Sequence, residues 1–370
     1  MREKRTYLLI ALAAGLGLAL TATVLGASGG PPVSSTAHLL PAPPGTTITE
    51  TVYLPVVMRD YPGMTVNPQI REDSLEFYHR VYLASAGVVI NWTGNHSTCN
   101  AGTTSQAFRD AVLLRINYFR AMAGVSSDVL LSAGYNDKAQ QAALMMSANG
   151  QLNHYPPSSW VCYSADGDDA AGHSNLCLGC YGPGAIDAYM HDNGAGNYFA
   201  GHRRWILYPP MIQMGTGDIP PGAGYSSANA LWVIGGFGPR PVTREPYVAW
   251  PPPGYVPYML VYPRWSFSVP GADFASATVS MSSGGESIPV ALNKLANGYG
   301  DNALVWEPAE SFGSAPPADK SYSVSVSNVL IEGMPTDFSY DVIAFDPDRG
   351  RVGWRDRFSD AQLGTPLFGP

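Results

Sequence analysis

The stretch that decides the fold runs from residue 196 to residue 217 and reads GNYFAGHRRWILYPPMIQMGTG. One histidine, His202, stands between a glycine and two arginines, and an apolar run at 205–207 follows directly. Gly201 is expected to let the backbone turn tightly before the histidine, and the apolar run is expected to anchor the segment in a core. A histidine held in this way could be a metal ligand, a catalytic base or a core residue. The rest of the chain has to distinguish these roles.

The length and composition favour a globular protein of two domains. The chain has 370 residues, more than one average domain needs. Its 40 glycines and 32 prolines favour loops and short strands over long helices. The formal net charge is −8 and no basic block is present, which argues against a nucleic-acid partner.

The first residues have the order of an export signal. Residues 1–28 carry early positive charges, then an apolar stretch, then small residues near Ala27, which predicts a secretory signal peptide cleaved there. A retained membrane anchor is the alternative, because the apolar run is nearly long enough to span a bilayer. Residues 29–69, rich in Pro, Gly, Ser and Thr, predict an extended linker.

The four cysteines, Cys99, Cys162, Cys177 and Cys180, fit an oxidising compartment. The CxxC at 177–180 could be a redox motif or half of a zinc site, but it lies in a Gly-rich stretch, and a structural disulfide is the preferred interpretation. Three pairings are open, and we predict Cys99–Cys162 and Cys177–Cys180.

The block 70–238 mixes helices and strands. Apolar residues at helical spacing predict helices over 105–124, 136–150 and 182–194. Asn136 or Asp137 would cap the second, and Gly150 and Gly194 would end the second and third. Strands are predicted over 211–219 and 228–238. Without a βαβ rhythm, this order indicates an α+β layer fold.

The block 239–346 differs from the first because strand-like runs recur at short intervals without a helical period. In the run SYSVSVS, Tyr322, Val324 and Val326 alternate with serines, which puts one face in a core and the other in solvent. This pattern predicts an all-β, immunoglobulin-like sandwich. Residues 347–370 are predicted to form a loosely attached tail.

Four of the seven histidines, His154, His173, His191 and His202, lie within about fifty residues of one another, among several aspartates. Such a density is the raw material of a metal or acid/base site. No two of them have the i, i+4 spacing that places side chains on one helix face, so tertiary folding must assemble any site.

Several segments together resemble the CAP superfamily, which comprises cysteine-rich secretory proteins, antigen 5 and pathogenesis-related proteins. The likeness covers about residues 105–238 in the family's order. It is carried by LLRINYFRAMAGV (113–125), DKAQQAALMMSANGQLNH (137–154), GHSNL (172–176), AIDAYMHD (185–192), GHRRWILYP (201–209), MGTG (214–217) and ALWVIGGFG (230–238). The segment GHSNL stands where the family usually has Gly-Glu-Asn.

The resemblance implies a three-layer α-β-α sandwich whose cleft holds two histidines and two acids. In several members the histidines bind a divalent cation. His154 and His202 match the histidines and Asp192 matches the second acid, whereas His173 or Ser174 replaces the first. The predicted cleft therefore contains these five residues. The predicted ligands of zinc or a similar divalent cation are His154, His202 and Asp192, with the two imidazoles within about 6 Å of each other.

Three functions are compatible with these residues. The preferred one is a CAP-type protein, secreted or held at the cell surface, that binds a lipid, a glycan or a cell-wall polymer, with the β-sandwich as an accessory module. A metal-assisted secreted peptidase is the second, but neither HExxH nor GxSxG is present, so a nucleophile or base is not recognisable. A non-catalytic structural surface protein is the third.

Overall fold

A four-stranded sheet forms the centre of the N-terminal part. The computed structural model describes residues 64–349, and all structural statements below concern these residues. The strand order is β1-β3-β4-β2, for β1 (Leu130–Leu131), β3 (Gln213–Ile219), β4 (Ala228–Trp232) and β2 (Ser174–Leu178). β1 runs parallel to β3, and the other pairs are antiparallel. Both strands predicted from the sequence in this block are therefore confirmed.

One face of this sheet is covered by α3 (Ala133–Asn149) and α4 (Ala165–His173). Small side chains fill this layer, because seven of its twelve buried apolar residues are alanines. The helix α3 lies so close to β3 that a Cβ added at Gly217 would overlap the backbone of Ala139. The glycines in MGTG are thus required by the helix–sheet contact.

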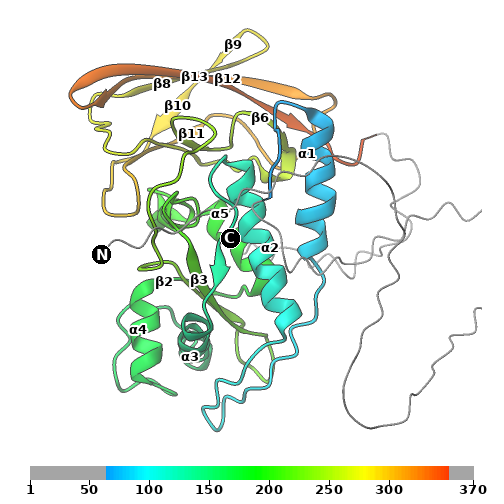
Figure 1. Cartoon of the computed structure of the whole chain (residues 1–370), viewed down its shortest axis with the longest axis vertical. Helices are drawn as coiled ribbons and strands as arrows, with labels where there is room; N and C mark the ends of the chain where they lie inside the picture. The colour runs from blue at the N-terminus through cyan, green and yellow to red at the C-terminus, as the bar shows by residue number, and fades with distance from the viewer. Residues whose placement is uncertain (1–63, 350–370) are drawn as a thin grey trace, which may run out of the picture. The chain divides into compact units, whose positions relative to one another are not determined.

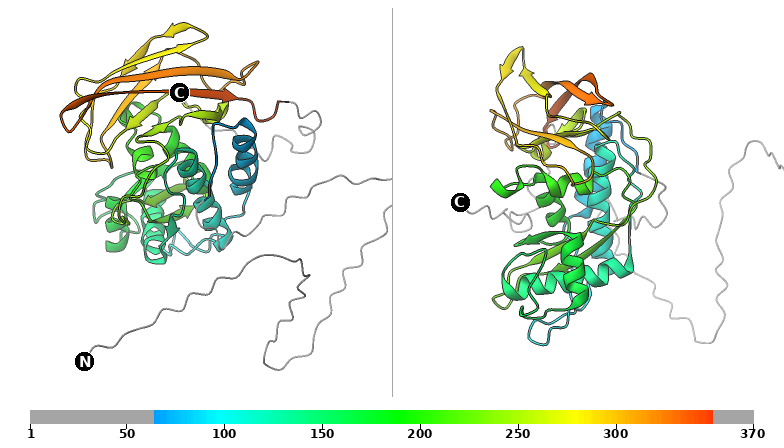
Figure 2. Two further views of the ribbon diagram at one scale, coloured as in Figure 1. Left: turned by 45° about the horizontal axis from the view of Figure 1, so that its top comes forward. Right: turned by 90° about the vertical axis from the view of Figure 1, so that its left-hand side faces the viewer.

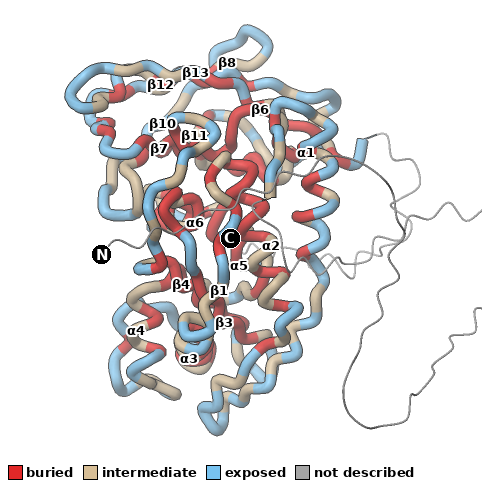
Figure 3. The backbone as a smooth tube through the Cα atoms, viewed as in Figure 1, coloured by how far each residue is buried: buried red, intermediate tan, exposed pale blue. Residues whose placement is uncertain are grey.

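The opposite face carries α2 (Gln106–Met122), α5 (Gly182–His191) and the short α6 (Gly201–Ile206). Large side chains dominate here, including the fully buried Ile116, Phe119 and Met190. Helices thus cover both faces, as the resemblance implied (Figure 1, Figure 3).

Several boundaries differ from the sequence prediction. Ser132 is the N-cap residue of α3, not Asn136 or Asp137; the side chain of Asn136 instead accepts a hydrogen bond from Thr216 N on β3. Helix α5 ends at His191, because Asp192 adopts a left-handed conformation. The helix therefore stops before Gly194, the predicted end. The helix α4 was not predicted, and its N-cap is Ser164.

A helical segment that the sequence patterns did not indicate precedes the sheet. It consists of α1 (Arg71–Phe77), the π-helix η1 (Tyr78–Tyr82) and the 3₁₀ turn η2 (Leu83–Ser85). Its aromatic residues pack on α2, with the rings of Phe77 and Tyr118 stacked 5.2 Å apart. The residues just before it, predicted as linker, are also engaged, since Pro68 O accepts a hydrogen bond from Tyr255 N.

The C-terminal part consists of two sheets. Their orders are β10-β11-β7-β5 and β6-β13-β12-β8-β9, and every pair is antiparallel except β6–β13. The strands are β5 (Val248–Trp250), β6 (Gly254–Pro257), β7 (Trp265–Ser268), β8 (Thr278–Ser283), β9 (Glu286–Ile288), β10 (Val290–Leu292), β11 (Ala303–Pro308), β12 (Lys320–Ile331) and β13 (Met334–Phe345). The 3₁₀ turn η4 (Tyr258–Leu260) follows β6.

Aromatic side chains meet between these two sheets. The rings of Trp265 on β7 and Tyr322 on β12 are 5.8 Å apart, and Trp306 Nε1 contacts Met281 Sδ at 3.1 Å. Along β12, the predicted alternation is confirmed, because Tyr322, Val324 and Val326 are buried while the intervening serines are exposed. The immunoglobulin-like label for this part remains a prediction.

The two parts share one hydrophobic cluster. It runs without a break from Phe77 and Ile116 of the N-terminal helices to Val324 and Ala344 of the C-terminal sheets. Figure 2 shows the sheets of the C-terminal part adjoining the helices of the N-terminal part. The predicted division at residue 239 remains a prediction, as does that at 346. The predicted signal peptide, most of the predicted linker and most of the predicted tail lie outside the described residues.

Candidate functional site

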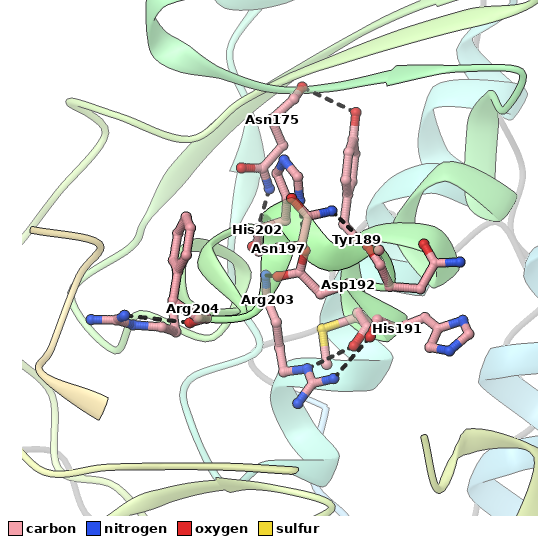
Figure 4. A network of polar contacts seen from close by, with 12 residues as sticks. Asn175, Tyr189, His191, Asp192, Asn197, His202, Arg203 and Arg204 are labelled. Atoms are coloured by element: carbon pink, nitrogen blue, oxygen red, sulfur yellow. Dashed lines mark hydrogen bonds and ion pairs between the residues drawn. The ribbon is translucent and has the colours of Figure 1, made fainter. Parts of the chain in front are cut away.

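The centre of the site is a hydrogen bond between His202 and Asp192. Asp192 ends α5, and His202 lies in the first turn of α6, so the short connection between these helices brings the two together. His202 Nδ1 donates to Asp192 Oδ1 at 2.8 Å, and the ring of Tyr189 lies 5.2 Å from the imidazole (Figure 4). Because the carboxylate only accepts, the neutral imidazole keeps its proton on Nδ1 and its lone pair on Nε2.

Both carboxylate oxygens of Asp192 accept hydrogen bonds from the protein. Its second oxygen accepts a hydrogen bond from Arg203 N at 3.2 Å, and the residue is only 1% exposed. It also holds a left-handed conformation, with φ of 53°, which Asp tolerates better than most residues. Asp192 therefore orients His202 through a buried hydrogen bond, as the residues behind metal-binding histidines do.

The tight turn before His202 is made by a residue other than the one predicted. Ala200, not Gly201, has the positive φ, at 52°. Gly201 is needed for another reason, since a Cβ at this position would overlap the ring of Phe199. The apolar run at 205–207 is confirmed as an anchor, because Ile206 and Leu207 are buried.

The second histidine of the predicted pair is fixed by a backbone carbonyl. Helix α3 ends at Gly150, which is left-handed with φ of 60°, and His154 follows in the loop. His154 Nδ1 donates to Ala171 O at 2.8 Å. Like His202, this imidazole is therefore held in the form that leaves Nε2 free to accept or to bind.

Both histidines are tied to the short junction between α4 and β2. Ala171 holds His154, and four positions later Asn175 Nδ2 donates to His202 O at 3.1 Å. Tyr189 OH, whose single proton is shared between Asn175 O at 3.0 Å and Asn229 Oδ1 at 2.8 Å, links this junction to α5 (Figure 4). Asn175 was quoted in the resemblance but not counted among the site residues, although it contacts His202 directly.

The side chain of His173 binds residues other than those around His202. Its Nδ1 donates to Asp169 O at 2.7 Å and lies 3.2 Å from that residue's carboxylate. Its ring stacks on Trp232 at 4.7 Å, and Tyr135 stacks on the same indole at 4.6 Å. These contacts place His173 with α4 and α3, whereas His202 belongs to α6.

Ser174 does not lie on the His202 side of the sheet. It alternates with Asn175 on β2 and shares a strand face with Leu176, which packs in the alanine-rich layer under α3. Its hydroxyl is buried and contacts no hydrogen-bond partner among the described residues. Ser174 therefore does not take the place of the family's first acid beside His202.

The predicted three-ligand cation site is not assembled as such. Across residues 64–349, no three His, Cys, Asp or Glu side chains are grouped so that they could hold a metal ion. Asp192, predicted as a ligand, uses its oxygens for His202 and Arg203 N. The Nε2 atoms of His154 and His202 are therefore the predicted donors that Nδ1 hydrogen bonds within the protein leave open, and their sharing of one cation stays a prediction.

A buried polar network supports the site from the sheet. Asp218 on β3 accepts hydrogen bonds from Gly182 N at 2.6 Å and from Asn229 Nδ2 at 2.8 Å, and Asn229 Oδ1 accepts from Tyr189 OH at 2.8 Å. Burial raises the pKa of Asp218, and these hydrogen bonds counteract part of the rise. Sequence reasoning missed this network, although a charged residue inside the apolar strand MGTGDI was a visible signal.

The arginines beside His202 bind backbone carbonyls rather than acids. Arg203 is fully buried, and its guanidinium donates to Met190 O at 2.6 Å and His191 O at 3.2 Å (Figure 4). Burial lowers its pKa to about 10, which leaves it charged at neutral pH. The positive charge is turned toward α5, away from the imidazole.

Both disulfides pair as predicted. Cys99 bonds to Cys162 with Cα atoms 5.0 Å apart, and Cys177 bonds to Cys180 with Cα atoms 5.9 Å apart. The first links the loop before α2 to the loop after His154. The described part of the chain contains no free cysteine.

Comparison with known proteins finds a family model that is similar to the segment holding the four-stranded sheet. Residues 113–235 match the family model described as CAP, the cysteine-rich secretory protein family. No curated protein matches the chain. Within residues 64–349, no helix is long and apolar enough to cross a membrane.

Proposed function

We propose that the protein, whose residues 113–235 match the CAP family model, is a secreted binding protein whose His154–His202 site takes a divalent cation such as zinc. Family members are typically secreted, and the two disulfides fit an extracellular location. The signal peptide predicted over residues 1–28 would provide the export route.

One observation carries the proposal: each imidazole has its Nδ1 fixed by a protein acceptor. Asp192 holds His202 and Ala171 O holds His154, at 2.8 Å in both cases. Such outer partners select the tautomer that binds metal through Nε2 and raise the basicity of the ring. The orientation of the Arg203 guanidinium toward carbonyls of α5 lessens the repulsion between its charge and a cation.

A cation held by two protein ligands would have modest affinity and coordination positions open to another molecule. When bound, it would offer a Lewis-acidic centre to oxygen donors, such as those of a lipid headgroup, a glycan or a cell-wall polymer. Cation and ligand binding should both weaken as the pH is lowered, because the imidazoles must be neutral to bind. The C-terminal sheets would act as an accessory module.

Neither Ser174 nor Ser147 is placed to act as a nucleophile, and a metal-assisted peptidase, which would use a bound water instead, stays the alternative. The buried Ser174 hydroxyl lies on the sheet face away from His202. A histidine–serine contact exists at His96 and Ser147, 2.8 Å apart, but Ser147 Oγ already donates to Ser226 O at 2.6 Å. This hydroxyl is therefore a structural link and not an activated nucleophile.

Calorimetric titration of the mature protein with Zn²⁺ tests the proposal. We expect one site in the wild type and at least a tenfold loss of affinity in both His154→Ala and His202→Ala. His173→Ala is the matched control, because it removes a neighbouring imidazole that the structure ties to Asp169 and Trp232. Absence of binding in the wild type, or full affinity in either site variant, would overturn the proposal. Turnover of casein would revive the peptidase alternative.

A further inference from the structure

The connection between α5 and α6 is the segment that brings Asp192 to His202, and its backbone is held in an unusual conformation. It runs from Asp192 to Ala200 and contains the 3₁₀ turn η3 (Ala195–Asn197). Both end residues are left-handed, with φ of 53° at Asp192 and 52° at Ala200. Non-glycine residues persist in this conformation only where surrounding contacts hold them there.

Those contacts come from the C-terminal sheets, outside the CAP-matched residues. One guanidinium, that of Arg264 just before β7, donates to three carbonyls of the connection. Its Nη1 binds Asp192 O and Asn197 O, the latter at 3.0 Å, and its Nη2 lies 3.4 Å from Gly194 O. The planar guanidinium spreads five donors over three nitrogens and can bridge separated carbonyls in this way, whereas a lysine has its three donors on one nitrogen.

Arg264 is itself positioned from β11. Glu307 accepts from Arg264 Nε at 3.0 Å and forms an ion pair with its Nη2 at 2.9 Å. Only 11% of the Arg264 side chain is exposed. A second residue of the C-terminal part, Asn293, donates to Tyr198 O at 2.9 Å, within the same connection.

Helix α6 also contacts β7 and the residue before it. Arg203, which follows His202, donates to Arg264 O at 2.8 Å and to Ser266 Oγ at 3.2 Å on β7. The backbone N–H of Arg203 also binds Asp192. The segment carrying His202 and Asp192 is therefore fixed to β7 from both of its ends.

We propose that Arg264, backed by Glu307, is a positioning residue for the His202–Asp192 pair, so that the C-terminal sheets complete the histidine site. On this account the C-terminal part is more than an appended adhesion module. Without Arg264, the connection would relax, the Asp192 carboxylate would move, and His202 would lose its fixed Nδ1–H tautomer. The inference concerns the site of the proposed function, but it can be tested without any cation.

The test is nitrogen-15 imidazole NMR on the metal-free, full-length mature protein at pH 8, where imidazoles are neutral. In the wild type, His202 should show the Nδ1–H tautomer with a slowly exchanging proton. In Arg264→Ala, that proton should exchange at least tenfold faster and the Nε2–H form should appear. Arg264→Lys and Glu307→Gln should give intermediate effects and cover the case in which the alanine variant folds poorly.

Two controls separate positioning from general loosening. His154 and His173, bound to Ala171 O and Asp169, should keep their spectra in every variant. Arg71→Ala removes another arginine that ties the N-terminal helices to the C-terminal part, through Asp319 at 2.7 Å, without touching the connection, and it should resemble the wild type. An unchanged His202 in Arg264→Ala, or equal changes in all three histidines, would overturn the inference. Loss of Zn²⁺ binding alone would bear only on the proposed function.

Discussion

Substitution of Asp192 should be far more damaging than substitution of a comparable exposed aspartate. The Asp192 side chain is fully buried and accepts hydrogen bonds from His202 Nδ1 at 2.8 Å and Arg203 N at 3.2 Å. Hydrogen bonds to charged groups contribute roughly 1.5–3 kcal/mol each. Because Asp192→Ala removes two of them, we expect it to lower the free energy of unfolding by about 3–6 kcal/mol.

Asp192→Asn separates charge from shape. Asparagine tolerates the left-handed conformation and keeps one acceptor, so a loss of about 1–2 kcal/mol is expected. Asp169→Asn is the matched control, because Asp169 also faces a histidine Nδ1, at 3.2 Å, but its side chain is 39% exposed. Exposed pairs contribute about 1 kcal/mol or less. Urea unfolding followed by tryptophan fluorescence measures all three variants, and equal losses for Asp192→Asn and Asp169→Asn would refute the reasoning.

Three further predictions follow from the loops and the boundary between the parts. Removing the Cys99–Cys162 bond, which spans 63 residues, should cost about 4 kcal/mol, measured as the difference in unfolding free energy for the double serine variant; a loss below 1 kcal/mol would contradict it. Burial lowers the pKa of His96 below 6.5 in the folded protein. The contribution of neutral His96 to the free energy of unfolding should therefore be fully present above pH 6.5 and be lost as the pH drops through the folded-state pKa. His96→Asn should flatten that fall in urea midpoints between pH 7.5 and 5.5, and identical pH profiles would count against it. Limited proteolysis should cut within residues 239–253, but the shared cluster should keep the fragments together in size-exclusion chromatography until denaturant is added; cuts scattered through 255–345 would argue against a boundary there.

Periodic segments could be predicted from the sequence because their residues repeat at the spacing of their own structure. The alternating Tyr322, Val324 and Val326 indicated β12, and the apolar spacing of Phe108, Val112 and Ile116 indicated α2. Helix α4 has the sequence ADGDDAAGH. Its small and acidic residues give no repeat of large apolar side chains that would mark the buried face. Its place is set by tertiary contact with the alanine-rich face of α3.

The members of the candidate site could be named from the sequence more easily than their roles. Family resemblance pointed to His154, His202 and Asp192, but spacing could not show whether the carboxylate faces an ion or an imidazole. That choice depends on the left-handed turn at Asp192 and on Arg203 N. Arg264, 62 residues after His202, contacts the site only through the packing of the C-terminal sheets, and no local pattern marks it.

The most direct test of the central claim is a crystal structure of the mature protein soaked with Zn²⁺, with anomalous diffraction recorded at the zinc edge. The account predicts one anomalous peak bonded to the Nε2 atoms of His154 and His202 at about 2.0–2.1 Å, with Asp192 still accepting from His202 Nδ1 and not touching the ion. A peak bonded to the Asp192 carboxylate, a peak at His173 instead, or imidazoles of His154 and His202 more than about 10 Å apart would contradict it.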